Sequence, residues 1–425
     1  MYLKRITLKN IRGIRELVWE APADQLPGWH VILGDNGSGK SAFLFSTALA
    51  LVGPREARML PFEWKYWLHR GEKTAQVSLE LIRDNQYDEI LNSEDAEKST
   101  LSAAIKIEAP TDRQQVEILK ASTKTKSDPD NHLWNGFSGW FSAGYGPYRR
   151  FYGSSETARL FSFPRLGSHL TLFEEGVNLI TGVDWLIDLR FKQLEDKNSP
   201  AGKLLDAIKN FINQTDFLPY GVQMGEVTSD LVEFQEGNGY SVAIEELSDG
   251  YRAILSLTLE LFRQLSLAYG ADKVFDQNDP TKVAVPGVVL IDEIDAHLHP
   301  TWQQQVGVWF RTHFPQMQFL VATHSPLVCQ AATVGSVYRL PQPGTDERGK
   351  MVTGVALDRL LYGDVLEAYS TELFGAISRS AEGEVMLDRL AELNIKALRE
   401  PLSEEEREEQ LRLRASLPIA AYTMK

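Results

Sequence analysis

The hydrophobic residues of this chain fall into two kinds of pattern, short apolar runs and longer apolar or amphipathic segments, which alternate along the sequence. Residues 30–33, 288–291 and 319–321 form short runs, typical of strands buried on both faces. Residues 42–52 and 249–268 are longer and predict helices. Buried strands that alternate with helices predict an α/β fold with a parallel or mixed sheet flanked by helices on both faces.

Polar and apolar residues alternate in other segments, which predicts half-buried strands. These segments are 2–8, 16–20, 74–82, 105–108 and 116–119, with further strands expected over 222–244 around the turn Gly237-Asn238-Gly239. Helices are expected over 185–194, 202–212 and 299–314, and from residue 365 onward, where Ser403 and Glu406 predict a capping box. Residues 122–148 are rich in Ser, Gly, Asp and aromatic residues and predict a loop-rich insertion.

The composition is that of an ordinary soluble globular protein, with 43% hydrophobic and 24% charged residues among 425. No uncharged apolar run approaches the ~18 residues of a membrane span, and the first residues begin a strand-like pattern rather than a secretory signal. We therefore expect a cytoplasmic protein without a membrane partner. Cys329 is the only cysteine, which excludes an internal disulfide and a multi-cysteine zinc site. The net charge of −14 argues against indiscriminate nucleic-acid binding but leaves a local basic groove open.

Residues 34–41 match the G-x-x-x-x-G-K-S pattern of a phosphate-binding loop, between an expected strand and an expected helix. Glycines let the backbone curl until its N–H groups face phosphate oxygens, and the helix N-terminus adds partial positive charge. Lys40 is expected to reach the β- and γ-phosphates, and the Ser41 hydroxyl to bind Mg²⁺. The candidate nucleotide-binding residues are Gly34, Asp35, Asn36, Gly37, Ser38, Gly39, Lys40, Ser41 and Ala42.

The apolar run 288–291 ends in Asp292 and Glu293. A phosphate-binding loop needs a carboxylate at a neighbouring strand end to hold the metal, usually through water, and Asp292 is expected to do so. Glu293 lies one residue further, where it can polarise the attacking water. Two adjacent acids after a strand could by themselves be a helix N-cap, but with a phosphate-binding loop in the same chain they indicate a Walker B motif.

Two further motifs flank these acids. Leu247-Ser248-Asp249-Gly250-Tyr251 opens the long helix, where Ser248 or Asp249 alone would be an ordinary N-cap. A Ser-x-Gly sequence at a helix N-terminus also makes an anion site. His324 follows the run 319–321 and is thereby expected at the sheet end, near the γ-phosphate and as a third catalytic residue beside Lys40 and Glu293.

Along the chain these four elements follow one another as the phosphate-binding loop, the 247–251 motif, the Walker B acids and His324. In this order they resemble the ABC-type ATPase superfamily, and within it the branch of SMC, RecF and related AAA family ATPases. The resemblance covers about residues 1–55 and 245–340, whereas the middle and the tail resemble only loosely the ATPase subunits of Septu-type (PtuA-like) or OLD-related anti-phage systems. The matching segments are Ile6–Gly13, Asn36–Gly39, Asp292–Pro300 and Leu247–Arg252, the last in place of the L-S-G-G-Q signature.

The resemblance implies a P-loop NTPase of the ABC ATPase type that uses ATP and Mg²⁺. It also implies a head-to-tail homodimer, or a higher assembly of dimers, in which Ser248, Asp249 and Gly250 cap the ATP of the second copy. Asp295 would lie in the D-loop that crosses the dimer interface. Gln76 lies where the family carries a Q-loop glutamine, but within an expected strand. His297 and His299, two residues apart and without a third partner, are expected to be loop structure rather than metal ligands.

The motifs divide the chain into four expected regions. Residues 1–125 form the N-terminal part of the ATPase core with the P-loop, and residues 126–235 an inserted, loop-rich and helical or β subdomain. Residues 236–345 complete the core with the signature, Walker B and switch-histidine motifs, and residues 346–425 form a helical C-terminal tail.

Several functions remain open at this point. The leading hypothesis is an ATP-gated dimer that controls a separate nuclease subunit of the HNH type in anti-phage defence, with nucleic acid reached through the complex. It depends on the absence of an effector within the chain. Related OLD-family proteins carry a TOPRIM nuclease after the ATPase, and Ala381-Glu382-Gly383-Glu384 faintly resembles its first acidic motif, but no Asp-x-Asp follows. The alternative is a RecF- or SMC-like ATPase that senses DNA structure or acts in DNA repair. A transporter subunit and a small-molecule kinase explain the 247–251 motif less well.

Overall fold

The computed structural model describes residues 1–88, 98–109, 116–123, 127–134, 140–147, 158–174, 181–214, 217–345, 347–369, 371, 373–374 and 380–417. By their internal contacts the residues form two compact units, Met1–Ala368 and Tyr369–Lys425. Among the described residues, no helix combines the length and the apolar character needed to cross a bilayer.

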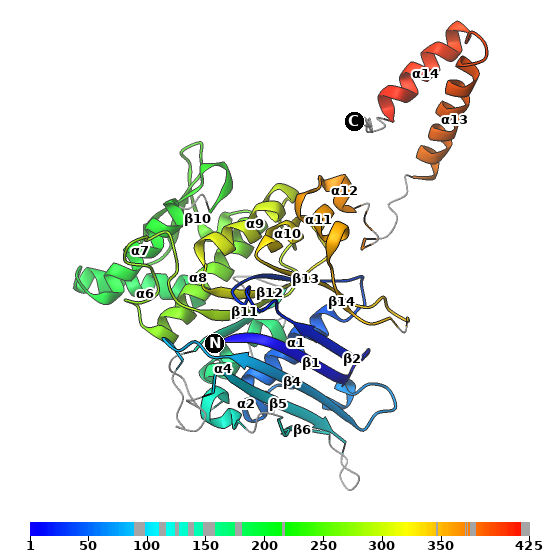
Figure 1. The fold of residues 1–425 in the computed structure, drawn as a ribbon. Coiled ribbons are helices and arrows are strands. Elements are labelled where there is room, and N and C mark those ends of the chain that lie inside the picture. The colour runs from blue at the N-terminus through cyan, green and yellow to red at the C-terminus, as the bar shows by residue number, and fades with distance from the viewer. Residues whose placement is uncertain are drawn as a thin grey trace. The chain divides into compact units, whose positions relative to one another are not determined.

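The larger unit is built around a six-stranded sheet with the order β14-β13-β3-β12-β11-β7 (Figure 1). Its strands run parallel except β14, which pairs antiparallel with β13 at one edge. The central strands contain only buried residues because helices pack on them. The mixed α/β sheet predicted from the sequence is confirmed. The strands are β3 Gly28–Leu33, β7 Ser142–Tyr145, β11 Gly287–Ile291, β12 Met317–Thr323, β13 Gly335–Arg339 and β14 Lys350–Met351.

A second, antiparallel sheet with the order β2-β1-β4-β5-β6 lies beside the first. Helix α1 (Lys40–Val52) contacts strands of both sheets and is buried along nearly its whole length, as its almost continuous apolar sequence requires. Residues of α1 and of the inner faces of both sheets form one core. The strands are β1 Tyr2–Ile11, β2 Ile14–Glu20, β4 Thr74–Ile82, β5 Thr100–Glu108 and β6 Glu117–Lys120.

Helices α7 (Pro200–Gln214), α8 (Asp249–Tyr269) and α9 (Pro300–His313) meet in an aromatic cluster. Phe211, Phe262 and Phe314 lie within 6 Å of one another by ring centroids. Helix α9 approaches β3 closely because it carries Gly307 at the contact, where a Cβ would lie 2.8 Å from the Trp29 ring. The cluster thereby fixes α9, and the loop that precedes it, against the central sheet.

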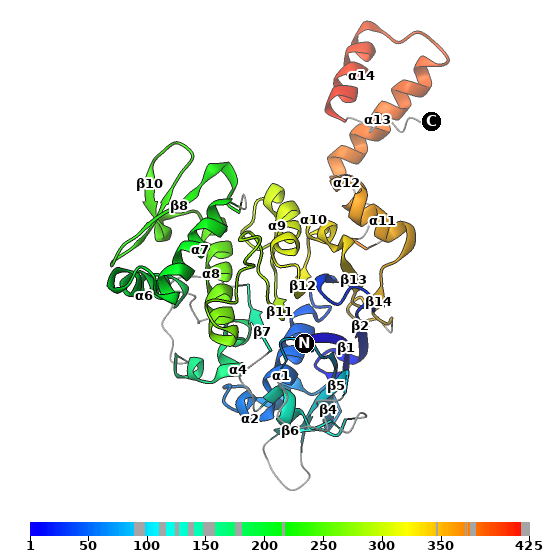
Figure 2. The same ribbon diagram turned by 60° about the vertical axis from the view of Figure 1, so that its left-hand side comes forward.

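A small three-stranded sheet, β10-β9-β8, adjoins α7 at the far end of this helical group (Figure 2). Asn213 on α7 joins the two, because its side chain both donates to the Met224 carbonyl (3.0 Å) and accepts from the Met224 N–H (2.7 Å). The strands are β8 Gln223–Val227, β9 Val232–Gln235 and β10 Ser241–Ala243, which confirms the strands expected over 222–244. The remaining helices of this unit are α2 Pro54–Ala57, α4 Pro164–Gly167, α5 Leu170–Phe173, α6 Thr181–Glu195, α10 Pro326–Cys329, α11 Gly354–Tyr362 and α12 Val365–Tyr369, the last ending one residue beyond the unit.

Strand β7 lies within the stretch 122–148 that the sequence predicts to be loop-rich, and this part of the prediction is wrong. Residues 142–145 pair in parallel with β11 and complete the edge of the central sheet. The strand is short, with the sequence Ser-Ala-Gly-Tyr, so it carries neither the apolar run nor the alternation that predicts a strand. Its pairing with β11 decides its conformation.

The smaller unit contains two packed helices, α13 (Ala381–Ala397) and α14 (Glu404–Ser416). Its buried core consists of Leu390, Leu393 and Leu413. The capping box predicted at Ser403 and Glu406 is confirmed: the Ser403 hydroxyl accepts from the Glu406 N–H, and the Glu406 carboxylate accepts from the Ser403 N–H. This unit therefore has a small core of its own.

Candidate functional site

The loop between β3 and α1 has a backbone that glycine makes possible. Gly37 and Gly39 have φ values of 81° and 100°, a left-handed conformation that favours glycine. At Gly34, a Cβ would lie 2.4 Å from the Ser38 hydroxyl, so this position also has no room for a side chain. The loop ends at the N-terminus of α1, whose first turn contains no acidic residue. It therefore presents backbone N–H groups and an uncompensated helix N-terminus to an anion.

Lys40 is buried at the start of α1, with its ammonium group turned back over the loop. Its Nζ donates to the Gly34 carbonyl at 2.8 Å and to the Asp35 carbonyl at 3.2 Å. The His324 Nδ1 lies 3.5 Å from the same nitrogen. Residues 284 positions apart in the sequence thus meet at one charged group, because the parallel strands β3 and β12 end side by side.

The acids that follow β11 lie at the same edge of the sheet. Asp292 is 2% exposed, and its N–H donates to the Tyr145 carbonyl of β7 at 2.8 Å. Glu293 has a φ of 47°, so the chain turns sharply away from the strand at this residue. A left-handed backbone at a residue other than glycine is stabilised only by its surroundings and occurs often at functional sites.

Electrostatics tie these residues together. Burial lowers the pKa of Lys40, while the carboxylates of Asp292, Glu293 and Asp295 oppose this shift. Burial, and then the charge of Lys40, lowers the pKa of His324, so its imidazole is neutral at pH 7. The site therefore holds one ammonium, a group of carboxylates and a neutral imidazole at the ends of three neighbouring strands.

A hydrogen-bond network connects the loop after β11 with the end of β12. The Thr323 hydroxyl donates to the Asp295 carboxylate. Gln303 on α9 donates through its amide to the carbonyl groups of Asp295 (3.3 Å) and Leu298 (2.9 Å), and its oxygen accepts from the Ser325 hydroxyl at 2.8 Å. The residues on either side of His324 are thus linked to the segment that carries Asp292 and Glu293.

The residues present fit a nucleoside triphosphate with its metal ion. The Ser38 hydroxyl is buried and has no hydrogen-bond partner in the described structure, which suits a group that points toward a phosphate. Within the described residues, no group of three or more His, Cys, Asp or Glu side chains could hold a metal ion by itself. Mg²⁺ is commonly bound by one or two protein oxygens together with phosphates and water, which Ser41 and Asp292 could supply here. His299 is the N-cap of α9, where its side chain accepts from the Thr301 N–H.

Ser248, Asp249 and Gly250 form the N-terminus of α8, with Ser248 as the N-cap. Ser248 and Asp249 are exposed, and no side chain caps the helix. Gly250 packs on the loop after β11, where a Cβ would lie 3.0 Å from the His297 carbonyl. Within the described residues, no hydrogen bond or ion pair joins these three residues to the loop 34–41. The N-terminus of α8 thus makes no such contact with the P-loop of its own chain.

The structure does not bring Gln76 to this site. Successive side chains of β4 alternate between the two faces of the antiparallel sheet, and Ala75 and Val77 face the core that contains α1. Gln76 therefore lies on the opposite face, where its amide donates to Ser78 at 3.0 Å. The expectation of a Q-loop glutamine at this position is wrong for this physical reason.

Gln303 and Thr323 are the site residues that sequence reasoning missed. Gln303 lies within the expected helix 299–314, where a polar residue is ordinary. Thr323 lies one residue before His324 and carries no signal of its own. The spacing from Pro300 to Gln303 places the side chain of Gln303 on the first turn of α9, facing the preceding loop. That proximity was the one signal available in the sequence.

Comparison with known proteins agrees with this geometry. The family described as "AAA domain, putative AbiEii toxin, Type IV TA system" matches residues 30–330, which include both the P-loop and His324. The chain belongs to this AAA-domain family. It is therefore an ATPase of the AAA type, and the match covers β7, β11, β12 and most of β3 in the central sheet.

Individual relatives match this chain over part of their own length. The Septu protein PtuA of Bacillus mycoides (strain KBAB4) is 24% identical over 83% of this chain and 42% of its own length. A retron Ec83 probable ATPase of Escherichia coli is 37% identical over 24% of this chain and 18% of its own. The chain thus spans less than half the length of these curated relatives. Among solved structures, an SMC head bound to the C-winged helix domain of ScpA covers 83% of this chain with a TM-score of 0.47 and 15% identity, a likeness too distant to carry an argument.

Proposed function

We propose that this chain binds ATP with Mg²⁺, hydrolyses it within a head-to-tail dimer of two copies, and thereby controls a separate nuclease, of the HNH type, in anti-phage defence. The observation that carries the proposal is the convergence of Lys40, Asp292, Glu293 and His324 at one edge of the sheet, beside a glycine loop built for phosphate. The AAA-domain family supplies the ATPase class.

Each residue has a role that its position supports. Backbone N–H groups of Gly34–Ala42 hold the phosphates, and Lys40 leaves the loop carbonyls to reach the β- and γ-phosphates. Ser41 and Asp292 would hold Mg²⁺, which would neutralise charge on the phosphates. Glu293 accepts the proton of the attacking water. His324, neutral at pH 7, orients that water or donates a hydrogen bond to the γ-phosphate.

A second copy completes the site in this proposal. Ser248 and Gly250 stand at an uncapped, exposed helix N-terminus, which suits the γ-phosphate of an ATP held elsewhere. Two-fold symmetry lets each copy supply a P-loop to one site and Ser248 to the other. Each hydrogen bond to a charged phosphate contributes ~1.5–3 kcal/mol, so a few of them per site make pairing depend on ATP. Asp295, held by Thr323, transmits this pairing to the loop that carries Glu293.

The defence role rests on the relatives. Those named above are a Septu protein and a retron probable ATPase, and the Septu protein matches most of this chain. The net charge of −14 favours contact with nucleic acid through a partner rather than through this chain alone.

Sedimentation of the purified chain tests the dimer. With ATP and Mg²⁺ we expect the dimer to form, and with ADP we expect the monomer. An oligomeric state that is the same with ATP, with ADP and without nucleotide would contradict ATP-dependent pairing.

Co-purification with the product of the neighbouring gene tests the effector. We expect a nuclease to be retained, and its cleavage of DNA or RNA to respond to ATP. Full nuclease activity of this chain alone would overturn the proposal of a separate subunit. ATP-dependent DNA binding by the chain alone would instead favour a DNA-structure sensor.

A further inference from the structure

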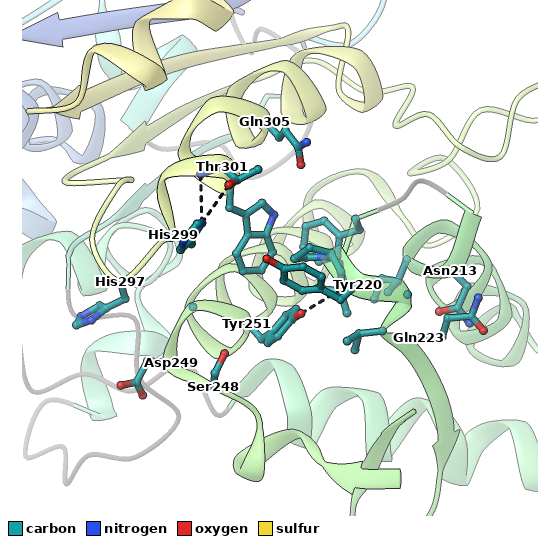
Figure 3. Close-up of a pocket in the computed structure, with 18 residues that line it drawn as sticks. Asn213, Tyr220, Gln223, Ser248, Asp249, Tyr251, His297, His299, Thr301 and Gln305 are labelled. Carbon is teal, nitrogen blue, oxygen red and sulfur yellow. Dashed lines mark hydrogen bonds between the residues drawn. The ribbon is translucent and has the colours of Figure 1, made fainter. Parts of the chain in front are cut away.

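A cavity of about 710 Å³ lies beside the N-terminus of α8, where Ser248 and Asp249 line it (Figure 3). Its walls come from the loop after α7, the start of α8 and the first turns of α9. Aromatic rings dominate these walls, and the rings of Tyr251 and Trp302 meet edge to face with centroids 5.2 Å apart. A volume of this size is typical of sites for small organic ligands.

Tyr220 forms the most unusual part of the wall. Its φ is 61° and its ψ 23°, a left-handed backbone that is an outlier for a bulky residue. The residue is 81% exposed and lines the cavity (Figure 3). A left-handed backbone is uncommon for a bulky residue, and such strain is found often at ligand clamps.

The rest of the structure holds the Tyr220 loop in this conformation. The Tyr251 hydroxyl donates to the Pro219 carbonyl at 3.0 Å, immediately before Tyr220. Gly237 packs on the other side, where a Cβ would lie 2.3 Å from the Tyr220 carbonyl oxygen. Two separate elements, α8 and the turn between β9 and β10, therefore keep the ring over the cavity.

The polar groups of the cavity indicate the chemistry of its ligand. Gln223 and Gln305 place amide groups at its wall, each able to donate and to accept a hydrogen bond. Among the described residues that line it there is no lysine or arginine, and its carboxylate, Asp249, is paired with Arg252. The cavity thus offers stacking surfaces and amides but no cation for a phosphate.

We propose that this cavity binds a nucleobase, stacked against the ring of Tyr220 and read at its edge by Gln223 and Gln305. A flat heterocycle with donors and acceptors on its rim suits aromatic walls and amides, and stacking on an aromatic side chain tolerates every base. The base belongs to a free nucleoside or nucleotide, or to an unpaired nucleic-acid strand.

Because of where the cavity lies, a ligand bound in it would regulate the pairing of two copies. This regulatory role rests on the proposed function. Ser248 and Asp249 line the same cavity and also belong to the surface proposed to meet the ATP of the second copy. A bound base therefore changes the rate of ATP-dependent pairing. Base binding itself requires neither ATP nor a second copy, so its failure and the failure of the proposed dimer are distinguishable.

Isothermal titration calorimetry of the full chain with adenosine tests the site, because adenosine lacks the phosphates that the P-loop binds. We expect Tyr220→Phe to retain the affinity, and Tyr220→Ala to weaken it about tenfold through the loss of stacking. Tyr240→Ala is the matched control, because Tyr240 is also exposed and near the three-stranded sheet but does not line the cavity. Lys40→Ala should leave adenosine binding unchanged.

A short single-stranded oligodeoxyadenylate, measured with the same variants, separates the two sources of the base. If the oligonucleotide binds more tightly than adenosine by a factor larger than its number of bases, and this binding depends on Tyr220, the base belongs to a nucleic-acid strand. Otherwise the free nucleoside or nucleotide is the source. The proposal is overturned if neither probe binds at millimolar concentration, if Tyr220→Ala binds like the wild type, or if Lys40→Ala abolishes adenosine binding.

Discussion

We propose that the P-loop and the N-terminus of α8 both hold phosphate, yet the two helix N-termini have different surroundings. Lys40 and Ser38 are buried, and the Lys40 ammonium is satisfied by carbonyl groups of its own loop. Ser248 and Asp249 are exposed, and the helix that they begin has no side-chain cap. The first anion site is prepared within the fold, whereas the second is left open to solvent.

This difference suits a divided active site. In the proposed site, phosphate would replace the carbonyl groups around Lys40, while glycine backbone angles and the buried α1 determine the shape of the loop. At the N-terminus of α8, by contrast, no side chain of the described residues forms the cap hydrogen bond that a phosphate could form. The predictions below test the division in order of decreasing effect on ATP hydrolysis.

Glu293→Gln should have the largest effect. Removing the base that activates water lowers the rate of hydrolysis by on the order of 10²–10⁴, while ATP binding persists and closed dimers accumulate. Steady-state phosphate release and sedimentation with ATP measure both effects. Glu195→Gln is the control, because Glu195 is exposed at the end of α6 and outside the motif segments. Unchanged turnover in Glu293→Gln would refute the role of Glu293.

Ser248→Arg and Lys40→Ala should each be inactive alone and should complement each other when mixed. In a head-to-tail heterodimer one site carries both changes and the other carries neither. We expect an equimolar mixture to recover about a quarter of wild-type hydrolysis, because half of its dimers are heterodimers with one intact site.

Ser229→Arg supplies the control for this mixture, since Ser229 is an exposed serine in the same region and is distant in sequence from the α8 N-terminus. Its ATP hydrolysis should match the wild type. A mixture no more active than its components would place Ser248 outside the active site.

Gln303→Ala should lower kcat about tenfold and leave KM for ATP nearly unchanged, since the loss of one positioning contact typically affects the reaction more than substrate binding. Gln303 positions the loop of Asp295 against Ser325 without reaching the P-loop itself. Steady-state kinetics provides the measurement, and Gln304→Ala on the same helix is the control. A rise in KM with unchanged kcat would show that Gln303 affects ATP binding instead.

His30→Gln should change how stability depends on pH in acid, rather than the rate of hydrolysis. Burial lowers the pKa of His30 on β3 to about 4, against about 6.5 in the unfolded chain. Between these values the unfolded state binds more protons, so the free energy of unfolding is highest above pH 6.5 and falls by up to about 3 kcal/mol as the pH drops to 4.

Denaturation of His30→Gln at several pH values should therefore show a shallower dependence on pH than the wild type. The exposed His299 supplies the control, and His299→Gln should keep the wild-type slope. Equal slopes in His30→Gln and wild type would contradict the burial of a neutral His30.

Leu390→Ala should leave ATP hydrolysis unchanged, because Leu390 belongs to the small core of the C-terminal unit. Loss of a buried leucine costs about 2–5 kcal/mol, which is enough to unfold a two-helix unit of this size. Hydrogen exchange should show rapid opening of residues 381–416 with normal protection of α1. Impaired hydrolysis would show that the two units are coupled.

Much of the central fold could be predicted because local pattern and tertiary environment agree there. The apolar runs at 30–33 and 288–291 are strands, and the glycines of the P-loop occupy the left-handed angles expected of them. The predictions failed where the two disagree. Strand β7 is too short to carry a pattern, and the position of Gln76 on β4 was decided by which face of the strand packs on α1.

The sequence by itself determined the phosphate-binding loop, the buried strands that flank it and the order of the motifs, because these depend on residue types at fixed local spacings. Only the tertiary structure decided that His324 lies 3.5 Å from Lys40, that Gln303 joins the Asp295 loop to Ser325, and that Tyr220 overhangs a cavity beside Ser248. Those contacts join residues far apart in the chain. The packing of parallel strand ends and helix faces produces these contacts, and local sequence patterns do not predict that packing.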